Sequence, residues 1–228
     1  MAYAAAAPRS HAAAESSGLM VGTAKLLVTA AVWLCASLLF SIVIEWIGMV
    51  WFWPEEGAQH SYDLLRAELA HLNGGDARPV LGIDAKAIVE RNATWTYETV
   101  WQRSGAIGVI DRLNGQVQEF AVALVNITLV FTTRVSILAL SMPTFAVFGL
   151  VGLADGLIER DLRRWGGGRE SGYVFHLAVR YIKPALIGAW VVYLSLPVSV
   201  SPFLVVVPFA VLFALAARIS AASFKKYL

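Results

Sequence analysis

Charged residues are missing from two long stretches of this sequence. Residues 135–154 contain no Asp, Glu, Lys or Arg over 20 positions, and residues 184–217 contain none over 34. A helix of about 20 apolar residues is long enough to cross a bilayer. With 58% hydrophobic and 15% charged residues and a mean hydropathy of +0.64, the composition excludes an ordinary soluble domain. We therefore expect an integral membrane protein.

Cysteine and histidine are also scarce, with one and four copies respectively. Cys35 has no second cysteine to pair with in the chain, and inside an apolar run it is expected to act as a small hydrophobic residue. The histidines are too far apart to share a metal ion, and no Ser-His-Asp or Cys-His set is visible. We therefore expect no metal site, no cofactor and no enzymatic activity.

A third uncharged run covers residues 26–44. A cleaved signal peptide is the alternative interpretation, because Arg9 and Lys25 precede the run. No small-residue cleavage site follows it closely, whereas a cluster of tryptophans and Pro54 do follow. Such a cluster is typical of an aromatic belt with a helix stop. This pattern favours an uncleaved membrane anchor.

The region between these runs is acidic and compatible with water. Residues 45–133 carry 11 acidic and 6 basic residues. Ser61, followed by several leucines, predicts a capped amphipathic helix that ends at Asn73, and Asp84 predicts the cap of a second helix. We therefore expect a small helical domain over residues 51–118.

The distribution of basic residues predicts the topology. Residues 1–25, residues 155–183 and the tail from Arg218 together hold 11 Lys and Arg. Because short cytoplasmic loops collect these residues, both termini and the 155–183 loop are predicted to be cytoplasmic, and the acidic domain lies outside. An even number of crossings follows.

Residues 184–217 supply the last two crossings in this scheme. Pro197 and Pro202 split the run with a turn at its middle. Each half has about 16 residues, which is short for a full span. A transmembrane hairpin is the first interpretation, and a re-entrant hairpin that stays below the outer face is the alternative.

The expected fold is an all-α integral membrane protein with about four transmembrane segments and a small helical extracytoplasmic domain. The predicted segments are a disordered cytoplasmic tail (1–25), a transmembrane helix (26–50), a helical periplasmic domain (51–118), a transmembrane helix with an outer extension (119–154), a cytoplasmic basic and glycine-containing loop with an interfacial helix (155–183), a transmembrane hairpin (184–218) and a cytoplasmic tail (219–228).

Two charges flank the predicted spans. Glu45 ends the first uncharged run and Arg134 precedes residues 135–154. If both lie at the outer boundary, we expect them to form a structural ion pair; the alternative places Arg134 in the middle of the bilayer, where a charge usually marks function. Gly152 and Gly156 are spaced for close helix contact, but the intervening charge of Asp155 makes that pattern weak.

The loop between the two longest uncharged runs is dense in arginine and glycine. Arginine suits carboxylates or phosphates, and an exposed tryptophan often anchors an interface. The predicted partner-binding residues are Arg163, Arg164, Trp165, Gly167, Arg169, Glu170 and His176. A flexible linker and a contact with anionic lipid are the alternatives. The glycine spacing does not match a phosphate-binding loop, because no Lys follows the glycines.

Three strings carry a resemblance to a known family. They are RWGGGRESGYVFH (164–176), YLSLPVS (193–199) and FKKYL (224–228). They resemble a family of bacterial membrane proteins carried by integrative and conjugative elements, which is defined by sequence and genetic neighbourhood. The likeness extends over most of the chain from Ala24 and is strongest after Asp155. It implies a part in conjugative DNA transfer beside other membrane proteins, with the coupling ATPase as one candidate, and it assigns no catalytic residue.

We therefore expect a non-enzymatic inner-membrane component of a type IV secretion-like conjugation apparatus that docks or organises other subunits. A small transporter or channel subunit is the alternative, but the predicted spans offer few polar groups beyond Ser37, Ser41 and Arg134. A membrane enzyme ranks third. Direct nucleic-acid binding is not expected, because the chain has no large basic region apart from the short loop. A homo-oligomer remains open.

Overall fold

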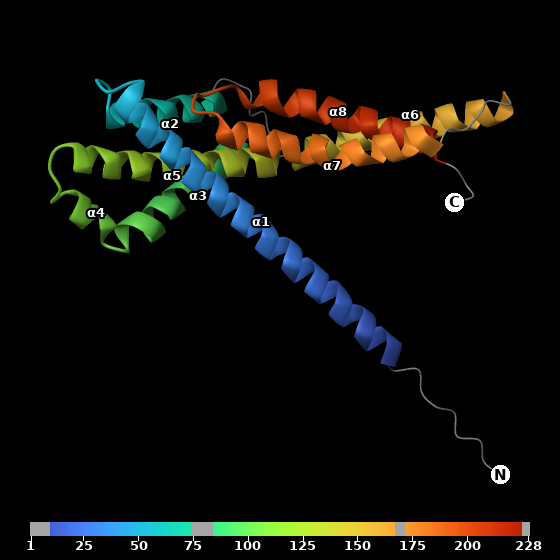
Figure 1. Cartoon of the computed structure of the whole chain (residues 1–228), viewed down its shortest axis with the longest axis horizontal. Coiled ribbons are helices and arrows are strands. Elements are labelled where there is room, and N and C mark those ends of the chain that lie inside the picture. Colours follow the sequence, from blue (N-terminus) through green and yellow to red (C-terminus); the bar gives the residue numbers. More distant parts are fainter. Residues whose placement is uncertain (1–9, 74–83, 167–171, 225–228) are drawn as a thin grey trace, which may run out of the picture.

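The computed structural model describes residues 10–73, 84–166 and 172–224, and every regular element in these ranges is helical (Figure 1). The α-helices are α1 (Ser10–Trp51), α2 (Ala58–Asn73), α3 (Ala85–Thr96), α4 (Ala106–Ile110), α5 (Gln116–Leu140), α6 (Met142–Trp165), α7 (Gly172–Ser195) and α8 (Pro202–Ala222), and the π-helix η1 (Tyr97–Gln102) follows α3. The predicted all-α class is confirmed.

Within the described residues, four helical segments are long and apolar enough to cross a membrane, judged by length and composition. They are Gly22–Trp51, Gln116–Trp165, Tyr173–Ser195 and Pro202–Ala222. The second segment joins α5 and α6 across a break at Ser141 and contains 50 residues. At 1.5 Å per residue it measures about 75 Å, against a hydrocarbon core of about 30 Å. Only part of this rod can therefore lie at the depth of the lipid.

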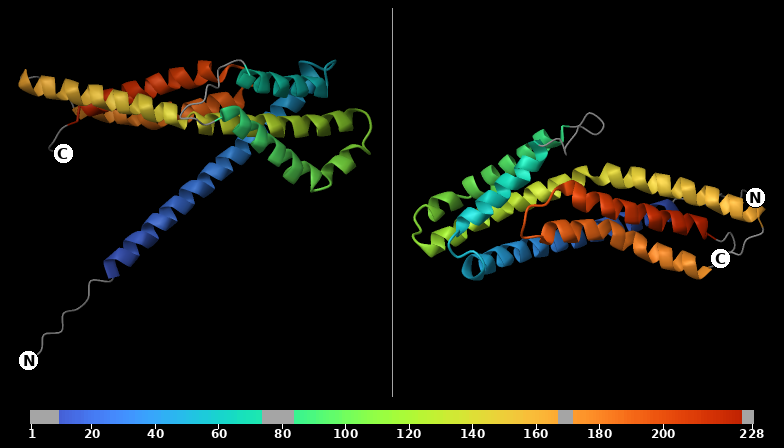
Figure 2. Two further views of the ribbon diagram at one scale, coloured as in Figure 1. Left: turned by 180° about the vertical axis from the view of Figure 1, so that it is seen from behind. Right: turned by 90° about the horizontal axis from the view of Figure 1, so that it is seen from above.

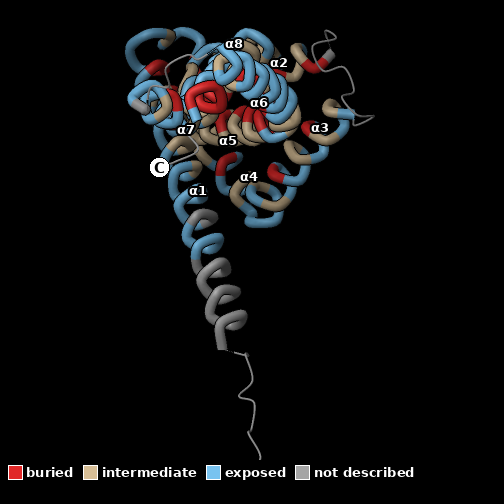
Figure 3. The backbone as a smooth tube through the Cα atoms, turned by 90° about the vertical axis from the view of Figure 1, so that its right-hand side faces the viewer, coloured by how far each residue is buried: buried red, intermediate tan, exposed pale blue. Residues whose placement is uncertain are grey.

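The helices form two groups along one long axis (Figures 1 and 2). In one group α8 lies between α6 and α7, and in the other α2 and α3 pack on α5. α1 contacts α5 and α7 near its C-terminal end and diverges from the bundle toward its N-terminus. Buried residues concentrate between α5, α6, α7 and α8, whereas the part of α1 whose burial is described is mostly exposed (Figure 3). The bundle core includes Leu138, Phe145, Ala189, Tyr193 and Ala210.

Three helix boundaries can be compared with the sequence prediction. α1 begins at Ser10, so residues 10–25 are helical instead of disordered; this segment contains several alanines, which favour helix. α2 begins at Ala58, and Ser61 is not its cap, because the Ser61 hydroxyl donates to Ala58 O at 2.7 Å. By contrast, Asp84 caps α3 as predicted and accepts a hydrogen bond from Ala87 N at 3.2 Å.

The predicted split of the last apolar run is present, because α7 ends at Ser195 and α8 begins at Pro202. The two helices have 24 and 21 residues, which is longer than the sequence prediction for each half. α7 is longer because its helix continues through Lys183 and Arg180 to Gly172. Both charged side chains are exposed and therefore do not interrupt the packing.

Glycines allow α6 and α8 to approach each other closely. A Cβ atom at Gly152 would overlap the carbonyl oxygen of Ala214, and one at Gly156 would overlap that of Arg218. The charge of Asp155 does not prevent this contact, because its carboxylate pairs with the Arg218 side chain at 2.5 Å. The Gly152 and Gly156 pattern, weak on sequence grounds, therefore brings the backbones of these two helices into close contact.

Candidate functional site

A buried arginine lies where the two helix groups meet. Arg134 on α5 is only 3% exposed. Its Nε and Nη2 atoms donate to Glu68 Oε1 at 2.9 and 2.7 Å. Nη1 also donates to Leu196 O at 2.5 Å, and Nη2 donates to Val198 O at 2.8 Å. An arginine carries five N–H donors, so most of its hydrogen-bonding capacity is used inside the protein.

Tyr193 on α7 completes the arrangement. The phenol is fully buried, and its hydroxyl donates to the second oxygen of Glu68, Oε2, at 2.9 Å. The Arg134 guanidinium lies over the Tyr193 ring, 5.4 Å from its centroid. A buried charge is costly unless it is paired and hydrogen-bonded, and here both partners are. We call Glu68, Arg134 and Tyr193 the latch.

The latch connects elements that are distant in the sequence. Glu68 belongs to α2, Arg134 to α5 and Tyr193 to α7, and the two carbonyl acceptors lie in the turn between α7 and α8. This turn is the tip of the apolar hairpin, whereas α2 belongs to the acidic region of the chain. The latch therefore connects α2, which belongs to the region predicted to lie outside, to the tip of the predicted membrane hairpin.

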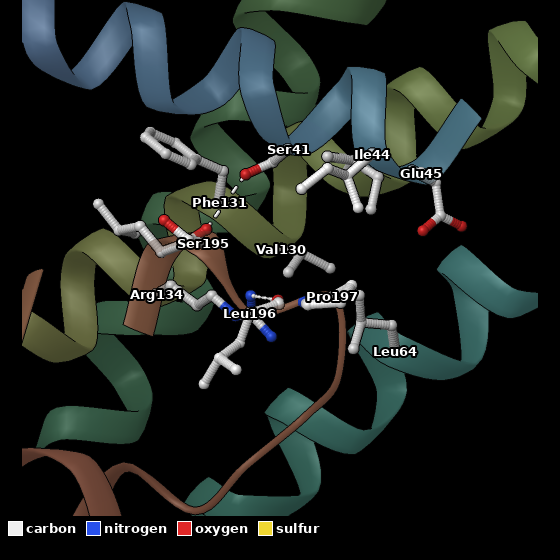
Figure 4. A pocket seen from close by; sticks show the side chains of 12 residues that line it. Ser41, Ile44, Glu45, Leu64, Val130, Phe131, Arg134, Ser195, Leu196 and Pro197 are labelled. Atoms are coloured by element: carbon white, nitrogen blue, oxygen red, sulfur yellow. Dashed lines mark hydrogen bonds between the residues drawn. The ribbon is translucent and has the colours of Figure 1, made fainter. Parts of the chain in front are cut away.

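The predicted Glu45–Arg134 ion pair is not formed. Glu45 is 2% exposed and pairs instead with His60 Nδ1 at 3.0 Å. The His60 ring also stacks on Trp53, with 4.0 Å between centroids. In Figure 4 the Glu45 carboxylate points toward α2, whereas the Arg134 guanidinium points toward the turn at Leu196. Each charge has a nearer partner on α2, which accounts for the error.

Glu45 and Arg134 nevertheless line the same small cavity (Figure 4). Its volume is about 20 Å³, enough for about one water molecule. Ser41 lies on its wall and donates to Leu194 O at 3.1 Å, which attaches α1 to the end of α7. Two buried or half-buried polar contacts therefore hold the C-terminal part of α1, one to α2 and one to α7.

The predicted partner-binding residues that the structure describes, Arg163, Arg164, Trp165 and His176, lie at the opposite end of the bundle. Arg163 pairs with Glu159 at 2.7 Å, and Arg164 lies 3.9 Å from Asp161. Trp165 ends α6 and is 92% exposed. Gly167, Arg169 and Glu170 lie outside the described residues.

His176 is exposed on α7 and meets the Phe175 ring edge to face at 5.5 Å. The structure therefore brings Arg163, Arg164 and Trp165 together on one helix end and places His176 on another helix. Trp165 has the exposure that an interface anchor requires.

Sequence reasoning missed Arg218 in this region. Its side chain pairs with Asp155 at 2.5 Å and with Glu159 at 3.2 Å, which links the ends of α8 and α6. Glu68 was missed at the other end. The signal for Glu68 was its spacing from Ser61 and Leu64, since all three lie on the buried side of α2. Within the described residues, no group of three or more His, Cys, Asp or Glu side chains could hold a metal ion.

A family match covers the whole latch. The sequence model of the family described as IncC plasmid conjugative DNA transfer protein DtrJ-like matches residues 52–225. The chain belongs to the DtrJ-like family. The expected membership of a conjugation-associated family is confirmed, and a role in conjugative DNA transfer follows from it. No curated protein and no solved structure matches the chain.

The DtrJ-like match begins immediately after α1 ends. It includes Glu68, Arg134 and Tyr193, together with the Trp165 end of α6. Glu45 lies outside it, so the Glu45–His60 pair connects α1 to the part of the chain that defines the family.

Proposed function

We propose that this DtrJ-like protein is a non-enzymatic inner-membrane component of the conjugative DNA-transfer apparatus that docks or organises other transfer proteins, with the coupling ATPase as a candidate cytoplasmic partner. Family membership supports the role in DNA transfer, and the apolar helices support membrane association. The docking role rests on one observation, which is the latch.

The latch fixes the position of α2 relative to the α7–α8 hairpin. Because Arg134 bonds to Glu68 of α2 and to the carbonyl groups of the hairpin turn, α2 cannot move relative to the hairpin without breaking buried, charge-assisted hydrogen bonds. A protein bound at the outer helices is thereby held in a fixed orientation relative to the Trp165 end of the bundle. A fixed spacing between two binding surfaces is what an organising subunit requires.

Two pairs of charges support the membrane placement. Lys25 and Glu45 delimit the longest uncharged part of α1, and Arg134 and Asp155 delimit the longest uncharged part of the α5–α6 rod. Each separation corresponds to about 30 Å of helix, which matches the hydrocarbon core. The excess of Lys and Arg at the level of Asp155 favours the cytoplasmic side for that end.

Recovery of partners from native membranes tests the proposal. We expect the double substitution Arg164→Gln with Trp165→Ala to leave the protein inserted and abundant, yet to weaken recovery of its cytoplasmic partner and to lower DNA transfer. Arg91→Gln with Trp95→Ala is the matched control, because it removes one exposed arginine and one exposed tryptophan from α3 in the predicted outer region. Normal transfer by the Arg164 and Trp165 variant, at normal protein levels, would refute docking through this end.

A further inference from the structure

α7 carries a row of basic residues on the side that faces away from the bundle. Ala178 and Ala185 are buried against neighbouring helices. His176, Arg180 and Lys183 each lie two positions from one of these alanines, and two positions correspond to a large rotation around the helix axis. All three are exposed. We call His176, Arg180 and Lys183 the basic face of α7.

The basic face is not neutralised by the rest of the described structure. α7 contains no acidic residue, and neither Arg180 nor Lys183 has an ion-pair partner among the residues that the structure describes. The acids at this end of α6 are occupied elsewhere: Asp155 and Glu159 pair with Arg218, and Asp161 lies next to Arg160 and Arg164. The basic face therefore presents positive charge outward.

Toward the C-terminal end of α7, beyond the basic residues, the same side of the helix becomes apolar. Ile187 and Val191 are 55% and 57% exposed, and each also lies two positions from a buried residue of α7. On the N-terminal side of the basic residues, Tyr173 is exposed at the start of the helix. Tyrosine and tryptophan are enriched at membrane interfaces. From Tyr173 to Val191 the side therefore changes from aromatic to cationic to apolar.

From this order we infer that the basic face of α7 binds the phosphate-containing headgroup of an anionic phospholipid, whose acyl chain lies along Ile187 and Val191. The positive charge is complementary to the headgroup, and long Lys and Arg side chains reach headgroups from positions near a helix end. An acidic protein segment could pair with Arg180 and Lys183, but its polar residues would not pack against the exposed Ile187 and Val191. The inference rests on the proposed insertion of α7 in the inner membrane.

Lipid counting on the intact protein tests the inference. The full chain is reconstituted into nanodiscs of equimolar phosphatidylcholine and phosphatidylglycerol and released in mild detergent, and the retained lipids are counted by native mass spectrometry. We expect phosphatidylglycerol to be enriched on the wild type. Arg180→Gln with Lys183→Gln should reduce the enrichment roughly fivefold per cation removed. Arg180→Lys with Lys183→Arg should retain it, because the charge is kept.

Arg103→Gln with Arg112→Gln is the matched control, because it removes the same charge from two exposed arginines in the predicted outer region. An equal loss of phosphatidylglycerol in this control, or its retention by the Arg180 and Lys183 variant, would overturn the inference. Retained lipid combined with loss of a co-purifying acidic protein would also overturn it and would identify a protein-docking face instead. Release of the wild type from membranes by alkaline carbonate would refute membrane insertion, and the proposed function would fail with it. An inserted protein that shows no lipid preference would refute only the inference about the basic face of α7.

Discussion

Arg134 and Glu68 form a buried ion pair in which one carboxylate oxygen, Glu68 Oε1, accepts hydrogen bonds from both Nε and Nη2 of the guanidinium. The two residues are 4% and 0% exposed at their side chains and are separated by 66 positions in the chain. The second oxygen of Glu68 accepts from Tyr193. Removing one member of such a pair leaves the other charge buried without compensation, so the latch is sensitive to single substitutions.

We expect Arg134→Ala to lower the free energy of unfolding by about 3–5 kcal/mol, because Glu68 would remain buried without its cation. Glu68→Gln with Arg134→Gln should cost less than the sum of the two single changes, because neither charge is then left unpaired. Thermal or denaturant unfolding in detergent micelles measures all four proteins of this double-mutant cycle. Additive losses would contradict the pairing of Arg134 with Glu68.

A second cycle separates the latch from the pairing predicted by sequence. Glu45→Gln with Arg134→Gln should show a much weaker coupling than the Glu68 cycle, because Glu45 bonds to His60 and reaches Arg134 only across the small cavity. A coupling energy as large as that of the Glu68 cycle would show that Glu45 and Arg134 pair directly.

The sequence contained enough information to predict that Arg134 has a structural or functional role, but not enough to identify the residue that pairs with it. Its position beside the uncharged run 135–154 predicted either the outer boundary or a functional site within the bilayer. Two carboxylates of the acidic region, Glu45 and Glu68, become buried near Arg134, and the position of Arg134 in the sequence does not choose between them. The choice depends on how α2 packs on α5, which involves contacts between residues far apart in the sequence. The helical spacing of Ser61, Leu64 and Glu68 indicates which side of α2 is buried, but it does not indicate which helix that side contacts.

The helices themselves were more predictable than their contacts. Uncharged runs, Pro202 and the Asp84 cap locate helices because each acts over a short stretch of chain. The predicted interfacial helix before residue 184 and the first half of the apolar run form one continuous helix, α7. A charged residue need not end a helix, and Arg180 and Lys183 lie on the side facing away from the bundle. The contact of Gly152 with α8 needed the position of Ala214, which no local pattern specifies.

His60 should matter for stability through Glu45. His60→Ala removes the side-chain partner of a carboxyl group that is 2% exposed, and a buried polar group without its partner costs about 1–3 kcal/mol or more. We expect a lower melting temperature in detergent micelles. His71→Ala is the control, since His71 lies on the same helix at its other end and takes part in no described ion pair. Equal melting temperatures for the two variants would show that the Glu45–His60 contact contributes nothing.

Gly152 should not tolerate a side chain. Gly152→Ala places a Cβ against the carbonyl group of Ala214 on α8, and backbone atoms cannot move aside as a flexible side chain can. Overpacking of this kind typically costs about 1–3 kcal/mol. Gly108→Ala is the control, because Gly108 has open space where the Cβ would lie. Unfolding measurements that place both variants at wild-type stability would mean that α6 and α8 are less closely packed than the structure indicates.

The topology predicted from the charge distribution can be tested directly. The acidic region holds 6 basic residues among residues 45–133, whereas the two tails and residues 155–183 hold 11. The second group is therefore expected in the cytoplasm. A reporter that is active only outside the inner membrane should be active when fused at Ala77 and inactive when fused at Gly167, and a reporter that is active only inside should give the reverse pattern.

Each fusion must be compared at equal protein abundance, since an unstable fusion is inactive for an unrelated reason. An outside-only reporter that is active at Gly167 would place Trp165 on the wrong side for a cytoplasmic partner, and the proposed docking through that end would fail with it.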